Sequence, residues 1–318
     1  MSKNALSEAA NAEIQDRLTK TTPPMDILVA KRLLLEVKSI MDEFKIKFFL
    51  RQGTCLAAVR DNAFIPWDDD LDIGVLLDAQ GFSEQSIPTL LAAFNTHGYY
   101  TETGYSDSLI VTTLSKDNIR VDLLFLRIVK GQVYHWPGIW FPSRLFTELK
   151  EIDFLGETFL VPNPAEEYLM IKYGPEWRTP KQHDYAKDVV DNIPIETKPR
   201  FTKRLKHFFQ IFQTNTARIQ ILDTNGLPVH KAKVRLVGFG VSETNKTGYA
   251  NLYLDRREYA YSMPATGTQD TGVFCSLVIT YNTHEEVLYE EILAPGFSYI
   301  YRQDPVHTKG RIFVLSQK

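Results

Sequence analysis

Apolar and polar positions follow two different patterns along the chain. Up to about residue 195, segments with apolar residues at helical spacing are mixed with short β-type runs. From Asp26 to Phe44, for example, apolar residues recur at helical spacing, which predicts an amphipathic helix with Asp26 as its N-cap. From Thr216 onward, short β-type runs alternate with turns, and no long helical period occurs. The pattern predicts an α+β domain followed by an all-β sandwich domain of roughly 100 residues.

Turn residues place the remaining elements of the first part. Lys116-Asp117-Asn118 has the composition of a β-hairpin turn between two apolar runs. A Pro near the start and a Gly just past the end bound a helix over 164–173. The other expected elements are a strand at 47–51, a turn at Gly53-Thr54, a helix at 55–60, a strand at 71–77, a helix at 83–94 and turns at Gly131 and Gly156.

Changes in composition indicate four segments. Residues 1–24 are polar and end in two prolines, so they are expected to form a flexible lead to a first domain over 25–195. Residues 196–215 are predicted to form a basic amphipathic linker helix, and 216–318 the sandwich. Between 198 and 212, apolar residues at helical spacing lie among five basic ones. Such a helix either contacts an anionic membrane or packs its apolar face on the first domain.

Composition and charge exclude several classes of protein. With 318 residues, 44% of them hydrophobic, the chain can bury a core, so whole-chain disorder, collagen and coiled coil are excluded. A net charge of −3 gives no global attraction for nucleic acid. Two distant cysteines, Cys55 and Cys275, offer neither a disulfide framework nor a thiolate metal site. Because the N-terminus has no apolar signal core, we expect a cytoplasmic protein, at most peripheral to the inner face of the membrane.

The densest group of chemically active side chains is an acidic run. Asp68, Asp69, Asp70 and Asp72 lie at the mouth of an apolar strand. Because side chains alternate along a strand, Asp70 and Asp72 should share a face, joined by Asp68 if the backbone is already extended there. Carboxylates this close repel one another unless a cation neutralises them, and oxygen ligands without His or Cys favour Mg²⁺ or Mn²⁺. The alternative is a solvated acidic loop.

Two further features complete this candidate site. Asp122 lies inside an otherwise apolar strand, where an unpaired charge is costly. It is therefore either a third metal-binding carboxylate or the partner of Arg120 or Arg127. The Gly53-Thr54 turn leads into a helix, where backbone N–H groups can hold a phosphate. A phosphate beside a metal pair is the arrangement expected for phosphoryl-group chemistry.

Two runs of residues resemble a known family. They are Gly53-Thr54 … Ala58-Val59-Arg60 … Phe64-Ile65-Pro66-Trp67-Asp68-Asp69-Asp70-Leu71-Asp72-Ile73-Gly74 and Tyr168-Leu169 … Tyr173-Gly174 … Trp177. Together they resemble the LicD/fukutin-related family over about residues 25–180. The family has a polymerase-β-like nucleotidyltransferase fold, which the resemblance implies for the first domain. Cys55 and Ala57 depart from the Leu and Gly usual at these positions.

The resemblance implies a metal-binding Asp-x-Asp at Asp70 and Asp72, with Asp122 as the third Asp. It also implies transfer of a phosphorylated alcohol or sugar from a nucleotide-diphosphate donor, often CDP-linked, to a glycan hydroxyl. Asp122 is then a third ligand or the base that takes the acceptor proton, and Asp68 is a further candidate for either role. The residues expected at the donor phosphate, base or sugar are Gln52, Gly53, Thr54, Arg60, Tyr173 and Trp177. Arg60 could instead hold the Asp residues, and the two aromatic residues could instead belong to the core.

Three other functions remain open at this point. The same site could transfer the nucleotidyl group itself to a small-molecule hydroxyl. Asp70-Leu71-Asp72 could be the metal motif of a glycosyltransferase. The chain could also be a glycan-binding protein with a degenerate first domain. The released product separates these functions, because nucleotidyl transfer keeps the monophosphate on the acceptor and glycosyl transfer releases a diphosphate.

The C-terminal part carries a weaker resemblance, made largely of turn residues. The residues are Ile221-Leu222-Asp223 … Gly226-Leu227-Pro228-Val229 … Ala232-Lys233-Val234 and Thr247-Gly248-Tyr249-Ala250. They resemble the carboxypeptidase-regulatory, transthyretin-like β-sandwich. No convergent set of acids, bases or metal ligands is expected there. We therefore expect an accessory role in glycan recognition, positioning or subunit contact.

Overall fold

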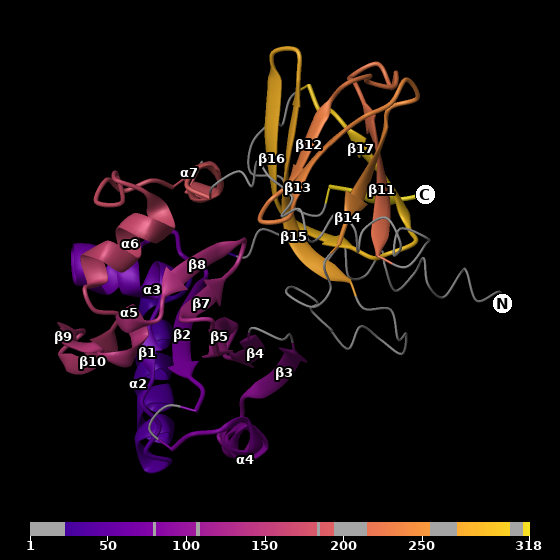
Figure 1. Cartoon of the computed structure of the whole chain (residues 1–318). Coiled ribbons are helices and arrows are strands. Elements are labelled where there is room, and N and C mark those ends of the chain that lie inside the picture. The colour runs from indigo at the N-terminus through magenta and orange to yellow at the C-terminus, as the bar shows by residue number, and fades with distance from the viewer. Residues whose placement is uncertain are drawn as a thin grey trace. The chain divides into compact units, whose positions relative to one another are not determined.

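The computed structural model describes residues 23–78, 81–105, 109–182, 185–193, 215–254, 272–305 and 314–318 (Figure 1). The chain forms two compact units. The first comprises the described residues of Thr22–His135 and Ile139–Gln182, and the second comprises Trp136–Gly138 and those of His183–Lys318. The predicted lead over 1–24 and linker helix over 196–215 lie almost entirely outside the described residues.

A five-stranded mixed sheet forms the centre of the first unit. Its strands, in spatial order, are β1 (Phe49–Leu50), β2 (Asp70–Leu76), β5 (Ile119–Leu126), β4 (Leu109–Lys116) and β3 (Tyr100–Tyr105). β2 and β5 are parallel, and the other neighbours are antiparallel. β2 is buried from Leu71 to Leu76, as expected for a strand in the interior of a sheet. Asp117 and Asn118 both adopt left-handed φ values in the β4–β5 turn, which confirms the predicted hairpin.

The first long helix confirms the periodicity in the sequence. α2 spans Ile27–Glu43, and the Asp26 carboxylate accepts hydrogen bonds from the backbone N–H groups of Leu28 (2.9 Å) and Val29 (3.1 Å). This capping satisfies donors that the first turn of a helix leaves unpaired. Its core-facing positions are fully or almost fully buried: Ala30, Leu33, Leu34, Val37, Ile40 and Met41.

The prediction of a turn at Gly53-Thr54 is wrong, because both residues lie in the helix α3 (Gln52–Leu56). Gly and Thr are weak helix formers, so tertiary hydrogen bonds override their local preference. The Gly53 N–H donates to the Asp72 carboxylate (3.2 Å), and the Thr54 hydroxyl accepts from the Asp72 N–H (2.8 Å). The helix continues as a π-helical turn, η1, over Ala57–Asp61.

The remaining elements of the first unit surround the sheet. They are η2 (Glu84–Ser86), α4 (Ile87–Thr96), β6 (Ile128–Val129), β7 (Gln132–His135), β8 (Ile139–Pro142), α5 (Arg144–Thr147), β9 (Lys150–Phe154), β10 (Glu157–Val161) and α6 (Ala165–Tyr173). The predicted turns at Gly131 and Gly156 are present, each with two consecutive left-handed residues. Aromatic rings fill the core, with Phe146 5.4 Å from Phe49 and 5.9 Å from Phe141 between ring centroids.

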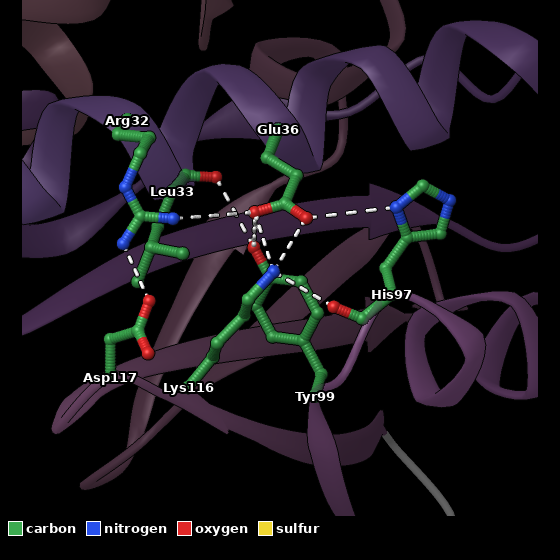
Figure 2. Close-up of polar contacts among 7 residues, drawn as sticks. All are labelled: Arg32, Leu33, Glu36, His97, Tyr99, Lys116 and Asp117. Carbon is green, nitrogen blue, oxygen red and sulfur yellow. Dashed lines mark hydrogen bonds and ion pairs between the residues drawn. The ribbon is translucent and has the colours of Figure 1, made fainter.

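A group of paired charges ties α2 to the sheet (Figure 2). We call it the Glu36 network; its members are Arg32, Glu36, His97, Tyr99, Lys116 and Asp117. Lys116 Nζ lies 2.6 Å and 2.9 Å from the two carboxylate oxygens of Glu36, and it also donates to the His97 carbonyl at the end of α4 (2.8 Å). Arg32 pairs with Asp117 at 2.5 Å. The network therefore joins α2, the β4–β5 hairpin and α4.

The second unit consists mainly of two four-stranded sheets. One has the order β14 (Tyr249–Tyr253), β11 (Thr216–Leu222), β17 (Ser298–Arg302) and β18 (Ser316–Gln317). The other has the order β13 (Gly240–Glu243), β12 (Lys233–Leu236), β15 (Val273–Tyr281) and β16 (His284–Leu293). Helix α7 (Tyr185–Asp191) groups with these sheets, where Lys187 pairs with Glu285 at 2.7 Å. Within the described part of the chain, no helix is long and apolar enough to cross a membrane.

Candidate functional site

Five aspartates meet at one end of the β2–β5 pair, and we call them the acidic cluster: Asp68, Asp69, Asp70, Asp72 and Asp122. The parallel register pairs Asp72 with Asp122 on the neighbouring strand. Carboxylate oxygens of Asp68, Asp69 and Asp70, which enter β2, lie within 4.8 Å of one another. Sequence alternation predicted the grouping of Asp68, Asp70 and Asp72 but assigned nothing to Asp69. The fold thus brings the predicted carboxylates together from two strands.

Four carboxylates of the acidic cluster have raised pKa values, so their negative charge is costly in these surroundings. Burial, followed by the charges of neighbouring aspartates, raises the pKa of Asp68 to about 8. Burial also raises the pKa of Asp70 and of Asp122 to about 6, each against the opposing effect of Arg120. The pKa of Asp72 is raised as well, mainly by burial. A cation would relieve this charge, and the donor set consists of carboxylate oxygens.

Asp72 is held in place by Arg51, the N-cap residue of α3, and by the first residues of α3 itself. The buried Arg51 guanidinium donates to Asp72 Oδ1 at 3.0 Å, and the Gln52 amide donates to the same oxygen at 2.9 Å. The Gly53 N–H donates to the other carboxylate oxygen, Asp72 Oδ2, and the Thr54 hydroxyl accepts from the backbone N–H of Asp72. The predicted phosphate-binding residues Gln52, Gly53 and Thr54 therefore contact the acidic cluster directly. Their role toward phosphate stays a prediction.

Arg120 contacts the acidic cluster from its solvent side. It forms an ion pair with Asp70, and its Nε lies 3.6 Å from Asp122 Oδ1. The sequence left Arg120 and Arg127 open as partners of Asp122. Arg120 is the one observed, whereas Arg127 pairs with Glu84 at 2.5 Å. Asp122 therefore pairs with Arg120 and also belongs to the acidic cluster.

Gly53 is required by a close approach at the cluster. A Cβ at this position would lie 2.6 Å from Asp68 Oδ2, which is too close for any side chain unless Asp68 moves. The φ angle of Gly53 is not in the left-handed region, so space rather than backbone conformation demands glycine here. Gly53 therefore sets where the Asp68 carboxylate can lie.

The structure places the other three predicted binding residues in different surroundings. Arg60 donates to the adjacent Asp61 at 2.6–3.0 Å, so in this structure its charge is paired locally. Trp177 is buried, and the Arg178 guanidinium lies 4.1 Å from its ring centroid. Tyr173, at the end of α6, is half-buried. Their contacts with a donor base or sugar stay predictions.

Several residues at the site were not anticipated from the sequence. The Tyr168 hydroxyl accepts the backbone N–H of Gln52 (3.0 Å), and Gln52 itself has a left-handed φ of 42°. Non-glycine residues in this conformation are strained and often lie at functional sites. Lys172 is buried one helical turn after Tyr168, and burial followed by the charge of Arg51 lowers its pKa to about 7. The four-residue spacing of Tyr168 and Lys172 was the available signal for a shared face.

The second unit contains a polar group that the sequence did not predict. The Tyr301 hydroxyl donates to the carboxylate of Glu286 and lies 2.7 Å from His284 Nε2. His284 and Glu286 belong to β16 and Tyr301 to β17, so these bonds join the two sheets. The expectation that no acids and bases converge here is wrong, because positions two apart in β16 share a face. Glu286 and Tyr301 are almost completely buried, as in a packed interior.

Comparison with known proteins relates the first unit to a family of transferases. Residues 45–164 match the family described as LicD/FKTN/FKRP, nucleotidyltransferase domain. The chain is 25% identical to ribitol 5-phosphate transferase FKRP of Homo sapiens over 162 residues, which cover 48% of this chain and 33% of that protein. It is 26% identical to ribitol-5-phosphate transferase FKTN of Homo sapiens over 165 residues, with the same two coverages. The resemblance predicted for residues 25–180 is thus confirmed over 45–164.

A bacterial relative extends the comparison. The chain is 39% identical over 46 residues to lipopolysaccharide cholinephosphotransferase LicD of Haemophilus influenzae, which cover 14% of this chain and 17% of that protein. The chain spans a third or less of each of these three curated relatives. All three are named as transferases of a phosphorylated alcohol. The whole acidic cluster lies inside the segment that matches the family.

Proposed function

We propose that this chain transfers a phosphorylated alcohol or sugar, of the phosphocholine or ribitol phosphate type, from a nucleotide-diphosphate donor to a glycan hydroxyl. The donor is CDP-linked, and nucleoside monophosphate is released. The observation that carries the proposal is the acidic cluster, whose buried carboxylates with raised pKa values lie within the segment similar to named phosphotransferases. A polymerase-β-like nucleotidyltransferase fold for the first unit and an accessory β-sandwich for the second belong to the same proposal.

The side chains of the cluster suit Mg²⁺ or Mn²⁺. Asp70, Asp72 and Asp122 would hold the ion through carboxylate oxygens, the ligands these cations prefer. The raised pKa values support this assignment, because burial makes the negative charge of these carboxylates costly even beside Arg51 and Arg120. A bound divalent ion supplies charge neutralisation for the diphosphate and for the leaving monophosphate.

The surroundings of each carboxylate suggest separate tasks. Arg51 and Gln52 both donate to Oδ1 of Asp72, so the position of this carboxylate is the most constrained of the three, and we assign it as the ligand that fixes the position of the ion. Asp122 has a side chain 25% exposed, compared with 7% for Asp72, so an acceptor hydroxyl can reach it more readily. Among the three proposed ligands, Asp122 is therefore also the candidate for taking the acceptor proton, with Asp68 as the alternative.

The location and partners of the chain are part of this proposal. A glycan acceptor and a CDP-alcohol are the substrates, and nucleic acid is not expected as a partner because the net charge is −3. A cytoplasmic location at the inner face of the membrane would bring the protein to both substrates. The segment over 198–212 that would contact the membrane lies outside the described residues.

The experiment that tests the proposal measures the released nucleotide. The full chain is incubated with Mg²⁺ or Mn²⁺, a glycan acceptor and a panel that includes CDP-choline and CDP-ribitol. We expect monophosphate from the wild type and a loss of this release in Asp70→Asn. Asp117→Asn is the matched control, because it removes a carboxylate of the Glu36 network and should leave release unchanged.

The identity of the product separates the competing functions. Monophosphate retained on the acceptor would indicate nucleotidyl transfer, and a released diphosphate would indicate glycosyl transfer. Equal release by the wild type and Asp70→Asn would contradict the proposed site.

A further inference from the structure

Two arginines neutralise part of the acidic cluster, and their environments are opposite. Arg51 lies beneath the cluster with a side chain only 2% exposed, bonded to Asp72. Arg120 lies on β5 with a side chain 44% exposed, paired with Asp70 and 3.6 Å from Asp122. One arginine is thus part of the interior, and the other faces solvent.

The two environments give the arginines different freedom to move. Removing Arg51 from Asp72 would leave two charged groups buried without their partner, which is costly. The Arg120 side chain is 44% exposed, whereas that of Asp70 is 13% exposed, so only the arginine of this ion pair is readily solvated. Arg120 can therefore turn toward solvent without unpacking the fold, provided that another cation takes its place at the buried carboxylates.

Arg120 is bonded to carboxylates that the proposed reaction needs for another purpose. Asp70 and Asp122 are two of the three carboxylates assigned to the divalent cation. Arg120 contacts Asp70 Oδ2 and lies near Asp122 Oδ1, so a cation bound by both carboxylates competes with the guanidinium for these oxygens and repels its positive charge. Its planar, five-donor group matches the oxygens of a phosphate in a bidentate contact. The donor brings two phosphates to this position with the cation.

We propose that Arg120 is a movable counter-charge of the acidic cluster and a binding group for the donor diphosphate. Arg120 pairs with Asp70 and Asp122 when cation and donor are absent. When the cation binds these carboxylates, the Arg120 guanidinium moves and binds the phosphate oxygens of the donor. This inference rests on the proposed function and adds a specific residue for recognition of the diphosphate.

The test uses two probes that do not require the true donor. Mn²⁺ alone is titrated into the full chain and followed by the electron paramagnetic resonance signal of free Mn²⁺. Pyrophosphate binding is then measured by calorimetry at saturating Mn²⁺. In Arg120→Gln we expect Mn²⁺ to bind several-fold more tightly, because the competitor is gone, and pyrophosphate to bind about tenfold more weakly. Arg120→Lys should fall between the wild type and Arg120→Gln for both probes.

The test is decisive because it has a matched control and because the two expected changes, tighter Mn²⁺ binding and weaker pyrophosphate binding, go in opposite directions. Arg32→Gln removes an arginine of similar exposure that is paired with Asp117 in the Glu36 network, and it should change neither binding constant. A purely structural role for Arg120 would weaken both probes together. Unchanged or weaker Mn²⁺ binding in Arg120→Gln, or unchanged pyrophosphate binding, would overturn the inference while wild-type nucleotide release still supports the function. Absence of Mn²⁺ binding by the wild type would overturn both.

Discussion

The acidic cluster and the Glu36 network are two groups of charged residues in the same unit, but their charges are arranged differently. In the Glu36 network each carboxylate has a basic partner: Glu36 pairs with Lys116, and Asp117 pairs with Arg32 (Figure 2). In the acidic cluster, five carboxylates face two arginines. Balanced charges join structural elements, whereas an excess of one sign costs stability unless a ligand of the opposite sign binds. The comparison therefore separates a structural site from a functional one.

The largest expected effect comes from the best-anchored carboxylate of the acidic cluster. Asp72→Asn should lower transfer by at least about 100-fold, because it removes a negative charge for the cation and replaces one of two accepting carboxylate oxygens by an amide NH₂ that cannot accept. Steady-state release of nucleotide measures the effect. Glu36→Gln is the counterpart in the Glu36 network and should keep transfer close to that of the wild type. Equal losses in the two variants would remove the distinction between the groups.

Gly53→Ala should reduce transfer by roughly 10-fold, because the new methyl group displaces the Asp68 carboxylate. The cost in stability should be small, since the displaced atoms end a flexible side chain. The assay is transfer rate together with thermal unfolding. In an Asp68→Ala background, the same glycine substitution should have little further effect, because the clash is already gone. A full additional loss there would mean that Gly53 acts through another contact.

Removing a charge from the Glu36 network should lower stability and leave activity nearly unchanged. Lys116→Met should lower the free energy of unfolding by about 2 kcal/mol, because it removes the two short contacts to the partly buried Glu36 and the bond to the His97 carbonyl, leaving Glu36 with the longer contacts of Arg32 and His97. Urea unfolding measures this, and transfer should stay within about twofold of the wild type.

Lys38→Met provides the comparison for this variant. Lys38 forms an exposed i,i+4 pair with Asp42 at 2.7 Å, so its loss should cost less than about 0.5 kcal/mol. A loss in Lys116→Met no larger than that in Lys38→Met would show that the Glu36 network is only a surface feature.

The smallest expected effect concerns Lys172. Burial lowers its pKa to about 7 from the ordinary 10.5, so above pH 7 the folded state has released a proton that the unfolded state still holds. Stability must then rise with pH across this interval, by about 1 kcal/mol between pH 7 and 8. Comparing urea unfolding of the wild type and Lys172→Met at both pH values isolates this contribution. The wild-type free energy of unfolding minus that of Lys172→Met should therefore increase from pH 7 to pH 8, and a decrease would contradict the lowered pKa.

Local patterns in the sequence were sufficient for the elements whose causes are local. Asp26 caps α2 because an Asp precedes an amphipathic run, and Asp117-Asn118 forms a hairpin turn because both residues tolerate left-handed φ values. The grouping of Asp70 with Asp72 followed from the alternation of side chains along a strand. Each of these predictions depends on residues close together in the chain.

Features that depend on distant partners could not be predicted in the same way. The helix at Gly53 forms because its N–H bonds Asp72, 19 positions away. Arg51 reaches Asp72, and Arg120 reaches Asp70, only through strand pairing, whereas the contact of Arg120 with Asp122, two residues away, was one of two alternatives that the sequence offered. The Glu36–Lys116 contact spans 80 positions. Tertiary contacts override local preference at these places.

The parallel pairing of β2 with β5 has a consequence for how the protein folds. Asp70 and Arg120 are 50 positions apart, and parallel strands meet only after the intervening chain has crossed over. Contacts of such long range form slowly, so the complete set of carboxylates exists only once this pairing is made. A ligand that binds this set stabilises only the paired state. The rate at which a divalent ion is bound during refolding would therefore report the rate at which β2 pairs with β5.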